Sequence, residues 1–108
     1  MTDPSGSQAR APLNVVLRKP TVHDVPAMAE IINGYAGQGK MLPRSHHRLY
    51  SDLRDFYVAT VDGRIVGCGG LSITWEDLAE VRSLAIDPAY VHQGIGRQIV
   101  ERLLAEAR

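Results

Sequence analysis

Apolar residues recur along the chain with two spacings, and each spacing predicts a different kind of element. Short runs rich in β-branched residues predict strands over 14–19, 56–61, 64–75 and 79–86. Apolar residues three or four positions apart predict a helix after Thr21, a short helix after Ser45 and a helix over 95–108. The chain therefore belongs to the α/β (α+β) class, with the element order β-α-α-β-β-β-α.

Short polar signals mark the bounds of the first two helices. Thr21 is followed three residues later by Asp24, in the arrangement of a capping box, and Pro26 fits the first turn of a helix. Gly34 is predicted to end this helix, since glycine is frequent just after a helical C-terminus. Ser45 is predicted to cap the second helix, because a serine hydroxyl accepts from free N–H groups there.

A tight hairpin is predicted at Asp62-Gly63, because a type I′ turn needs positive φ at both central positions. Its second arm, 64–75, contains three glycines. These are Gly67, Gly69 and Gly70. Glycine within a strand indicates a bulge or a ligand close to the backbone. Tight packing of a helix against the sheet is an equally good interpretation.

The segment after the hairpin combines an apolar strand with a glycine turn. The strand 79–86 is apolar except at Glu80, Arg82 and Ser83, a pattern typical of a central strand covered on both faces. The residues Gln93-Gly94-Ile95-Gly96 then lead into the last helix. Backbone N–H groups that converge at a helix N-terminus favour an anion, so a phosphate site is one interpretation.

Two familiar phosphate-binding motifs do not match this turn. A dinucleotide fingerprint needs a third glycine at position 99, which is Ile99, and a Walker loop needs Gly-Lys-Ser/Thr where Gly96 is followed by Arg97. The remaining interpretations are an anion turn of another kind and glycines that only shape the passage from strand to helix.

Composition narrows the partners. The 108 residues contain twelve basic and twelve acidic side chains, so bulk charge favours neither a nucleic acid nor an anionic membrane as a partner. No apolar run approaches the roughly 20 residues of a membrane span. His46 and His47 lack the i, i+4 spacing of a metal pair, so no metal site is predicted. We expect a cytoplasmic protein with a disordered leader over 1–13.

Cysteine usage agrees with a reducing compartment. The single cysteine, Cys68, cannot form an internal disulfide. A buried structural thiol is the role expected for it.

Two stretches of this chain resemble the GNAT acetyltransferase superfamily. They are Val81-Arg82-Ser83-Leu84-Ala85-Ile86-Asp87-Pro88-Ala89-Tyr90 and Gln93-Gly94-Ile95-Gly96-Arg97. The first resembles the strand, and the second the turn, of the acetyl-CoA-binding core. The resemblance implies a mixed, mainly antiparallel sheet with helices on both faces. It also implies acetyl-CoA as cosubstrate and no metal.

Within that superfamily, three further stretches are similar to short, kinase-less N-acetylglutamate synthases. They are residues 39–45, 66–71 and 79–82. This similarity implies acetyl transfer to the amino group of a small amino acid, with L-glutamate expected, as in the first step of arginine biosynthesis. A homodimer is a further possibility for this family. A GNAT enzyme acting on another amine, and an inactive fragment that binds CoA or a partner, are the alternatives.

The resemblance also implies where acetyl-CoA lies. Backbone N–H groups of 93–97 would hold the pyrophosphate, and the strand edge at 84–86 would pair with the pantetheine amides like an added strand. A backbone N–H near Leu84 would polarise the thioester carbonyl. The implied cofactor-binding residues are Leu84, Ala85, Ile86, His92, Gln93, Gly94, Ile95, Gly96 and Arg97.

The acceptor side carries the implied catalytic group. Glu80 matches the family's general base, since an ammonium group must lose a proton before it attacks. Its alternative is a structural ion pair with Arg82, two residues away on the same strand face. Arg44 matches the arginine that holds a substrate carboxylate, and its alternative is an exposed loop arginine. Ser45 and Arg82 complete the implied substrate-binding set.

The chain departs from the family's pattern in two ways. Val91 and His92 replace the Arg or Gln and the Gly that usually open the turn, so one side-chain contact to the pyrophosphate is missing. His92 or Arg97 could partly replace that contact. The chain also stops after the helix that follows the fourth strand. We therefore expect residues 14–108 to be the N-terminal part of the acetyltransferase domain, with the fourth strand at an unpaired edge.

Overall fold

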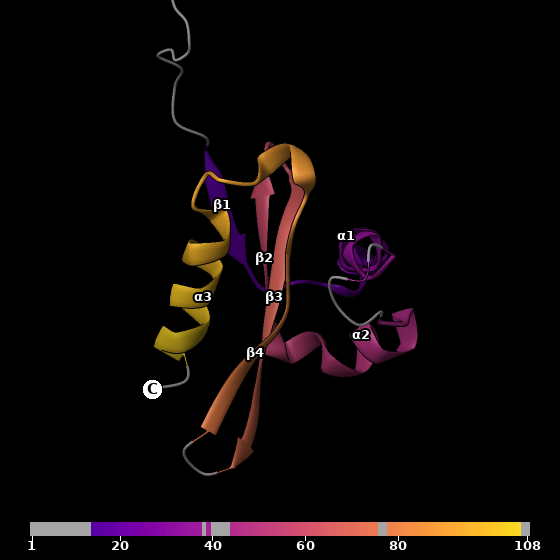
Figure 1. Cartoon of the computed structure of the whole chain (residues 1–108), viewed down its shortest axis with the longest axis vertical. Coiled ribbons are helices and arrows are strands. Elements are labelled where there is room, and N and C mark those ends of the chain that lie inside the picture. The colour runs from indigo at the N-terminus through magenta and orange to yellow at the C-terminus, as the bar shows by residue number, and fades with distance from the viewer. Residues whose placement is uncertain (1–13, 38, 40–43, 76–77, 107–108) are drawn as a thin grey trace, which may run out of the picture.

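The computed structural model describes residues 14–37, 39, 44–75 and 78–106, which form a sheet with helices on both faces (Figure 1). All neighbouring strands are antiparallel and lie in the order β1-β2-β3-β4. The strands are β1 (Val15–Arg18), β2 (Phe56–Val61), β3 (Arg64–Trp75) and β4 (Leu78–Ile86), and the helices are α1 (Val25–Ala36), α2 (His46–Asp52) and α3 (Ile95–Glu106). The predicted element order is confirmed. The leader expected over 1–13 lies outside the described residues.

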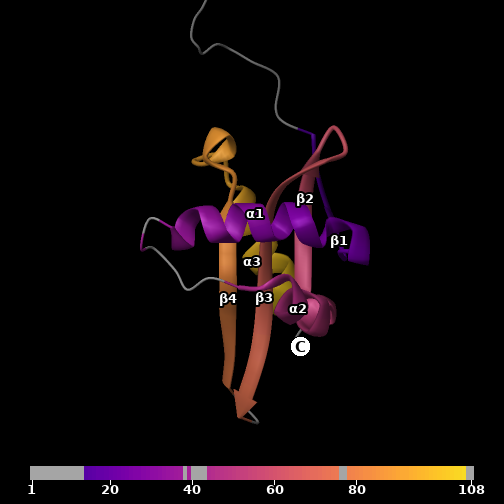
Figure 2. The same cartoon turned by 90° about the vertical axis from the view of Figure 1, so that its right-hand side faces the viewer.

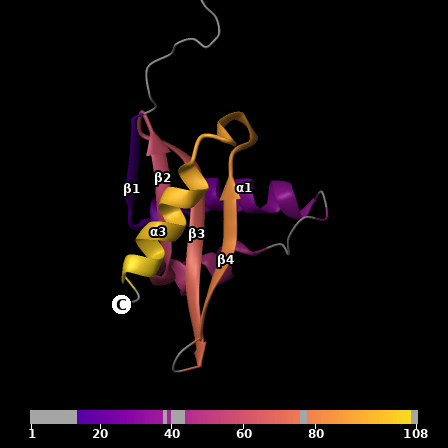
Figure 3. The same ribbon diagram turned by 60° about the vertical axis from the view of Figure 1, so that its left-hand side comes forward.

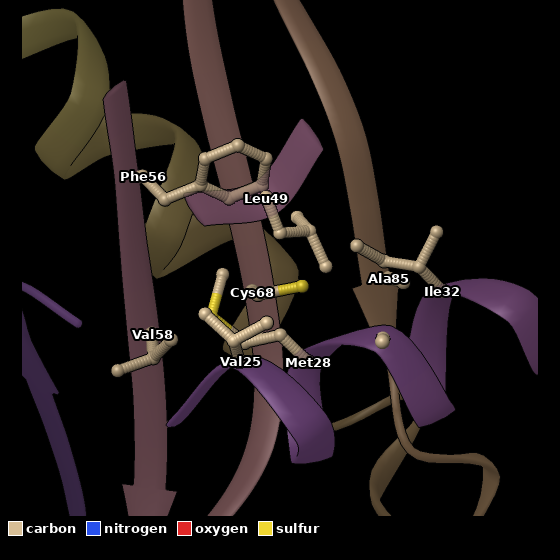
Figure 4. Packing of buried hydrophobic residues seen from close by; sticks show 9 residues of the cluster. Val25, Met28, Ile32, Leu49, Phe56, Val58, Cys68 and Ala85 are labelled. Carbon is tan, nitrogen blue, oxygen red and sulfur yellow. The ribbon is translucent and has the colours of Figure 1, made fainter. Parts of the chain in front are cut away.

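The two faces of the sheet bury two separate cores. Alternate residues of β2 point to opposite faces, so Phe56 and Val58 face α1 and α2 while Tyr57 and Ala59 face α3. The core under α1 and α2 contains Val25, Met28, Ala29, Ile32, Leu49, Phe56, Val58, Cys68 and Ala85 (Figure 4). The core under α3 contains Tyr57, Ala59, Val61, Val66, Ile95, Ile99 and Leu103, and Figure 3 shows α3 lying across the strands.

An ion pair fastens the start of α1 to the end of β1. Arg18 donates to both carboxylate oxygens of Asp24, from Nη1 at 2.7 Å and from Nη2 at 3.1 Å. Asp24 also accepts from the backbone N–H of Thr21 at 2.7 Å, which confirms the capping arrangement. These hydrogen bonds, with that from Arg18 first, lower the pKa of Asp24 to about 2.

The end of α1 differs from the prediction. The helix continues past Gly34 to Ala36, and Gly37 follows it. Tyr35 explains the extension, because its ring packs against the core under α1 and its hydroxyl donates to the carbonyl of Ile86. Tertiary packing therefore outweighs the glycine signal.

The β2–β3 hairpin forms as predicted. Its turn residues Asp62 and Gly63 have φ values of 52° and 79°, as a type I′ turn requires. The glycines of β3 mainly allow close packing. A Cβ would lie 2.7 Å from Ile86 Cδ1 at Gly67, 2.9 Å from Ile99 Cγ2 at Gly69 and 2.9 Å from the Phe56 ring at Gly70.

Strand β4 is an edge strand in the described sheet, which corrects the expectation of a central strand covered on both faces. It pairs with β3, and among its side chains Ala85 is the buried one. Its first half, with Leu78 to Glu80 exposed, projects with β3 beyond the helices (Figure 2). The apolar residues of β4 are therefore explained by its second half, which α1 and α3 cover. The edge position itself was predicted.

Cys68 is a buried free thiol, as predicted. Burial raises its pKa to about 12, while the charge of Arg44 lowers it by a smaller amount. In the described part of the chain, no helix has both the length and the apolar character needed to cross a membrane.

Candidate functional site

A bulge in β4 shapes the region of the sheet where the predicted site residues lie. Cys68 pairs with Ala85 and Gly70 pairs with Arg82, so β4 has one residue more than β3 across this interval. Ser83, within the interval, has φ of +54°, which is uncommon for a residue other than glycine. In this interval the extra residue belongs to β4. The bulge that the glycines of β3 had suggested lies beside Gly67, where β3 has one residue more than β2 between the pairs Ala59–Gly67 and Thr60–Ile65.

The bulge changes which face the β4 side chains occupy. Beyond it, Leu84 packs in the core under α3 and Ala85 in the core under α1. Before it, Val81 again faces α3, and Arg82 lines a cavity on the α2 side. Glu80, two residues from Arg82, shares that side. An unbroken alternation would have placed these two charged residues on the opposite face.

Arg44 is held close to this bulge rather than exposed on a loop. Its side chain is 15% exposed, and its Nη1 lies 2.6 Å from Asp52 Oδ2 in α2. Its Nε donates to Ser83 Oγ at 3.0 Å. Its guanidinium carbon lies 5.7 Å from the centre of the Phe56 ring, within the range of a cation–π contact. The structure therefore removes the alternative of an unengaged arginine.

Helix α1 holds the backbone of Arg44. Asn33 donates from Nδ2 to the Arg44 carbonyl at 3.1 Å and accepts from the Arg44 N–H at 2.9 Å. Sequence reasoning missed Asn33, Asp52 and Ser83, because each meets Arg44 only through the tertiary fold. The sequence carries a weak signal for Asp52. It follows Arg48 by four residues, the spacing at which opposite charges pair on a helix.

A small cavity of about 70 Å³ adjoins Arg44. Its lining includes three arginines and two aspartates, and Glu80 pairs with one of these arginines, so positive charge is in excess there when that pair separates. The lining residues are Arg44, Arg48, Asp52, Asp55, Phe56, Gly70, Leu71, Ser72 and Arg82. Ser45 caps α2 as predicted, by accepting from Arg48 N at 3.1 Å. A direct role of Ser45 with substrate remains a prediction.

Glu80 forms the ion pair that was its alternative role. Its Oε1 accepts from Arg82 Nε at 3.1 Å and from Nη2 at 3.0 Å. The side chains of Glu80 and Arg82 are 58% and 43% exposed. Water screens the attraction between two exposed charges, so this pair contributes little to the stability of the fold. Its two side chains can therefore separate when a ligand binds. The geometry is compatible with both roles of Glu80.

Asp87 fixes the passage from β4 to α3 through one hydrogen bond of its backbone and one of its side chain. Its N–H donates to the Val66 carbonyl at 2.8 Å, and its Oδ1 accepts from Ala89 N at 2.9 Å. A single 3₁₀ turn, Pro88–Tyr90, follows. The turn therefore starts from a well-defined end of the sheet.

Positive φ angles then direct the chain into α3. His92 and Gly94 have φ of 64° and 79°. The first i→i−4 bond of the helix is donated by Gln98 to the Gly94 carbonyl at 3.1 Å. The N–H groups of 95–97 precede that bond and have no partner within the helix, which is the arrangement that suits an anion.

Side chains contribute little to this turn. His92, Gln93 and Arg97 are exposed, and Arg97 pairs with Glu101 at 3.2 Å. Ile95 is 1% exposed because it packs in the core under α3. Contacts from this segment to a ligand would therefore come mainly from the backbone.

A larger cavity of about 450 Å³ lies beside the first one and shares Asp55, Leu71 and Ser72 with it. On its wall the Tyr57 hydroxyl donates to Glu106 Oε2 at 2.6 Å, a bond that raises the Tyr57 pKa. The described residues contain no group of three metal-ligating side chains placed to hold an ion.

The Acetyltransferase (GNAT) family model matches residues 25–108. An amino-acid acetyltransferase of Mycobacterium tuberculosis is 42% identical over 96 residues, covering 86% of this chain and 55% of that protein. An amino-acid acetyltransferase of Azotobacter vinelandii is 36% identical over 93 residues, covering 85% of this chain and 22% of that protein.

Two solved structures have the same fold. A Mycobacterium tuberculosis protein in complex with CoA and a second ligand has a TM-score of 0.80 at 42% identity, covering 86% of this chain and 57% of that one. N-acetylglutamate synthase from Neisseria gonorrhoeae, complexed with coenzyme A and N-acetyl-glutamate, has a TM-score of 0.83 at 29% identity, covering 87% of this chain and 22% of that one.

The chain thus spans 55% of the Mycobacterium tuberculosis relative and 22% of the Azotobacter vinelandii relative. The family model nevertheless covers α1 through the last residue, including the bulged strand and the turn before α3. The predicted superfamily is confirmed: this chain belongs to the acetyltransferase (GNAT) family.

Proposed function

We propose that the protein transfers an acetyl group from acetyl-CoA to the amino group of a small amino acid, and that the acceptor is L-glutamate, as in the first step of arginine biosynthesis. The observation that carries the proposal is the placement of Arg44, held beside the β4 bulge by Asp52 and Ser83. A fixed guanidinium at this point suits an acceptor that bears a carboxylate.

The relatives support this choice of acceptor. The Mycobacterium tuberculosis and Azotobacter vinelandii relatives are amino-acid acetyltransferases. The Neisseria gonorrhoeae structure pairs coenzyme A with N-acetyl-glutamate on the same fold. This chain spans only part of each relative, so L-glutamate as its own acceptor is a proposal.

The chain's own residues suit acetyl-CoA. The N–H groups of 95–97 and the positive φ of Gly94 form a turn that can hold a pyrophosphate. The open edge of β4 at 84–86 offers backbone groups to the pantetheine amides. When bound, acetyl-CoA would supply the acetyl group as a thioester, whose C–S bond breaks as the amine nitrogen forms its bond to the carbonyl carbon.

Residues of β4 would assist the transfer. Glu80 would take the proton that the ammonium group of the acceptor must lose, directly or through one water. The N–H of Leu84, which follows the bulge, would donate to the carbonyl oxygen as negative charge develops there. Arg44, with Ser45 and Arg82 nearby, would hold the acceptor by its carboxylate.

The test is a CoA-thiol release assay on the full-length protein with a panel of amines. The panel contains L-glutamate, L-glutamine, other amino acids, a polyamine and a peptide N-terminus. We expect the highest kcat/KM with L-glutamate. If another amine is preferred, the proposal that L-glutamate is the acceptor is wrong, while the proposal of acetyl transfer from acetyl-CoA is supported. If acetyl-CoA binds in a calorimetric titration but no amine is acetylated, the protein is a CoA-binding module.

A further inference from the structure

Arg44 has two side-chain partners from different elements, and one of them is the residue at the bulge. Asp52 in α2 binds Nη1 at 2.6 Å, and Ser83 in β4 accepts from Nε at 3.0 Å. We propose that Ser83 and Asp52 are positioning residues that fix the Arg44 guanidinium for the carboxylate of the acceptor. This inference rests on the proposed function and extends it to two residues outside the predicted set.

The two bonds leave a defined part of the guanidinium for a ligand. Among the described residues, the side-chain hydrogen bonds of Arg44 engage Nε and Nη1. Both hydrogens of Nη2 and one hydrogen of Nη1 remain as donors for a carboxylate. The ring of Phe56, 5.7 Å from Cζ, adds a cation–π contact to these two bonds.

Asp52 can hold Arg44 without neutralising the site. Its Oδ2 accepts from Arg48 Nε at 3.1 Å as well as from Arg44. Two guanidinium groups therefore share one carboxylate, and Arg48 is 65% exposed at the rim of the cavity. Arg44, Arg48 and Asp52 together keep one net positive charge, which the carboxylate of an acidic acceptor would balance.

Ser83 connects the proposed binding site of the acceptor carboxylate with the place where the acetyl group would be transferred. Its φ of +54° belongs to the bulge, and the bulge brings its hydroxyl to Arg44. The next residue is Leu84, whose N–H is the proposed donor to the thioester carbonyl. Through Ser83, the place where the carboxylate is held and the place where the acetyl group reacts share one backbone unit.

Ser83→Gly isolates the hydroxyl, because glycine adopts positive φ without strain and the bulge can persist. We expect this variant to raise the acceptor KM about tenfold, as for a lost hydrogen bond to a charged group. We expect kcat and the acetyl-CoA KM to change less than about threefold, since the reacting groups stay in place. Asp52→Ala should raise the acceptor KM in the same way.

A double-mutant cycle then asks whether Ser83 acts through Arg44. In the Arg44→Ala background, Ser83→Gly should leave the acceptor KM unchanged, because no guanidinium remains to be positioned. If the two changes multiply instead, Ser83 acts by another route and the inference is wrong. A fall in kcat with unchanged KM in Ser83→Gly would also overturn it.

A second readout separates this inference from the proposed function. The Nε–H signal of Arg44 in the ¹⁵N NMR spectrum of the full-length protein is assigned by its loss in Arg44→Lys. The signal should exchange faster with water in Ser83→Gly than in the wild type, and unchanged exchange contradicts the contact. If the wild type acetylates no amine that carries a carboxylate, the proposed function fails, whatever the NMR result.

Discussion

The two ends of β4 are built in different ways. At its first half, Glu80, Arg82 and Ser83 meet partners through side chains, and Arg44 reaches them from another element. Beyond its last residue, the turn into α3 has two residues with positive φ and N–H groups that precede the first helical bond, while its polar side chains are exposed. The first end suits recognition of a particular acceptor. The second suits a phosphate, which many sequences can bind through the same backbone.

This difference predicts how each end fails. A side-chain site loses function when one partner is truncated, because each group has a specific role. A backbone site tolerates changes in its exposed side chains and fails when a residue cannot adopt the required φ.

Glu80→Gln should have the largest effect. We expect kcat at neutral pH to fall about 100-fold, because an amide cannot take the proton of the ammonium group. Steady-state kinetics with L-glutamate measures it. Arg82→Ala breaks the same ion pair and keeps the carboxylate of Glu80, so kcat should fall far less, while the acceptor KM rises because Arg82 belongs to the proposed substrate-binding set. If both variants cause the same small loss, Glu80 has only the structural role.

Arg44→Ala should come next. The acceptor KM should rise between about 10- and 100-fold, since hydrogen bonds to a charged group contribute about 1.5–3 kcal/mol. The KM for acetyl-CoA should change little. Arg102→Ala, which removes an exposed arginine beside Tyr57, is the control and should alter neither KM. A matching rise in the acetyl-CoA KM would contradict the separation of the two ends.

Gly94→Ala tests the backbone end. Its φ of +79° is unfavourable for alanine, so unfolding free energy should fall by about 1–2 kcal/mol and the acetyl-CoA KM should rise. Urea denaturation and kinetics measure the two effects. Gly96→Ala is the control for the unfolding free energy, because its Cβ would find its nearest protein neighbour at 3.8 Å, an ordinary contact. Equal losses in both variants would show that the turn does not depend on positive φ.

Asp24→Asn should give the smallest effect and spare both ends. The Asp24 pKa of about 2 lies below the ordinary 3.8, so its ionised form stabilises the fold above about pH 4. That contribution is lost as pH falls from 3.8 towards 2. Because Arg18 is 39% exposed, we expect only about 1 kcal/mol at pH 7. Urea denaturation of the wild type and of Asp24→Asn at several pH values measures the free energy of unfolding of each. The two values should become equal near pH 2.

Local signals explain why most of the fold was predictable. The hairpin at Asp62-Gly63 and the cap at Ser45 depend on residues next to one another, and both formed as expected. Gly34 misled because Tyr35 gains contacts that no local rule describes. The superfamily pattern located the turn and Glu80, whose roles stay predictions.

The network around Arg44 could not be predicted. Asn33, Asp52 and Ser83 come from three elements, and only the folded chain brings them to one arginine. The bulge at Ser83 shows in the sequence only as two polar residues in succession, Arg82 and Ser83, a pattern that does not by itself predict positive φ.

The most direct test of the account identifies the product. The full-length protein is incubated with acetyl-CoA and L-glutamate, and NMR follows the amino acid while a thiol reagent follows free CoA. We predict N-acetylglutamate and CoA in equal amounts, with the acetyl group on the α-nitrogen. CoA released without an acetylated amino acid, or acetylation of a different amine in preference to glutamate, would contradict the account.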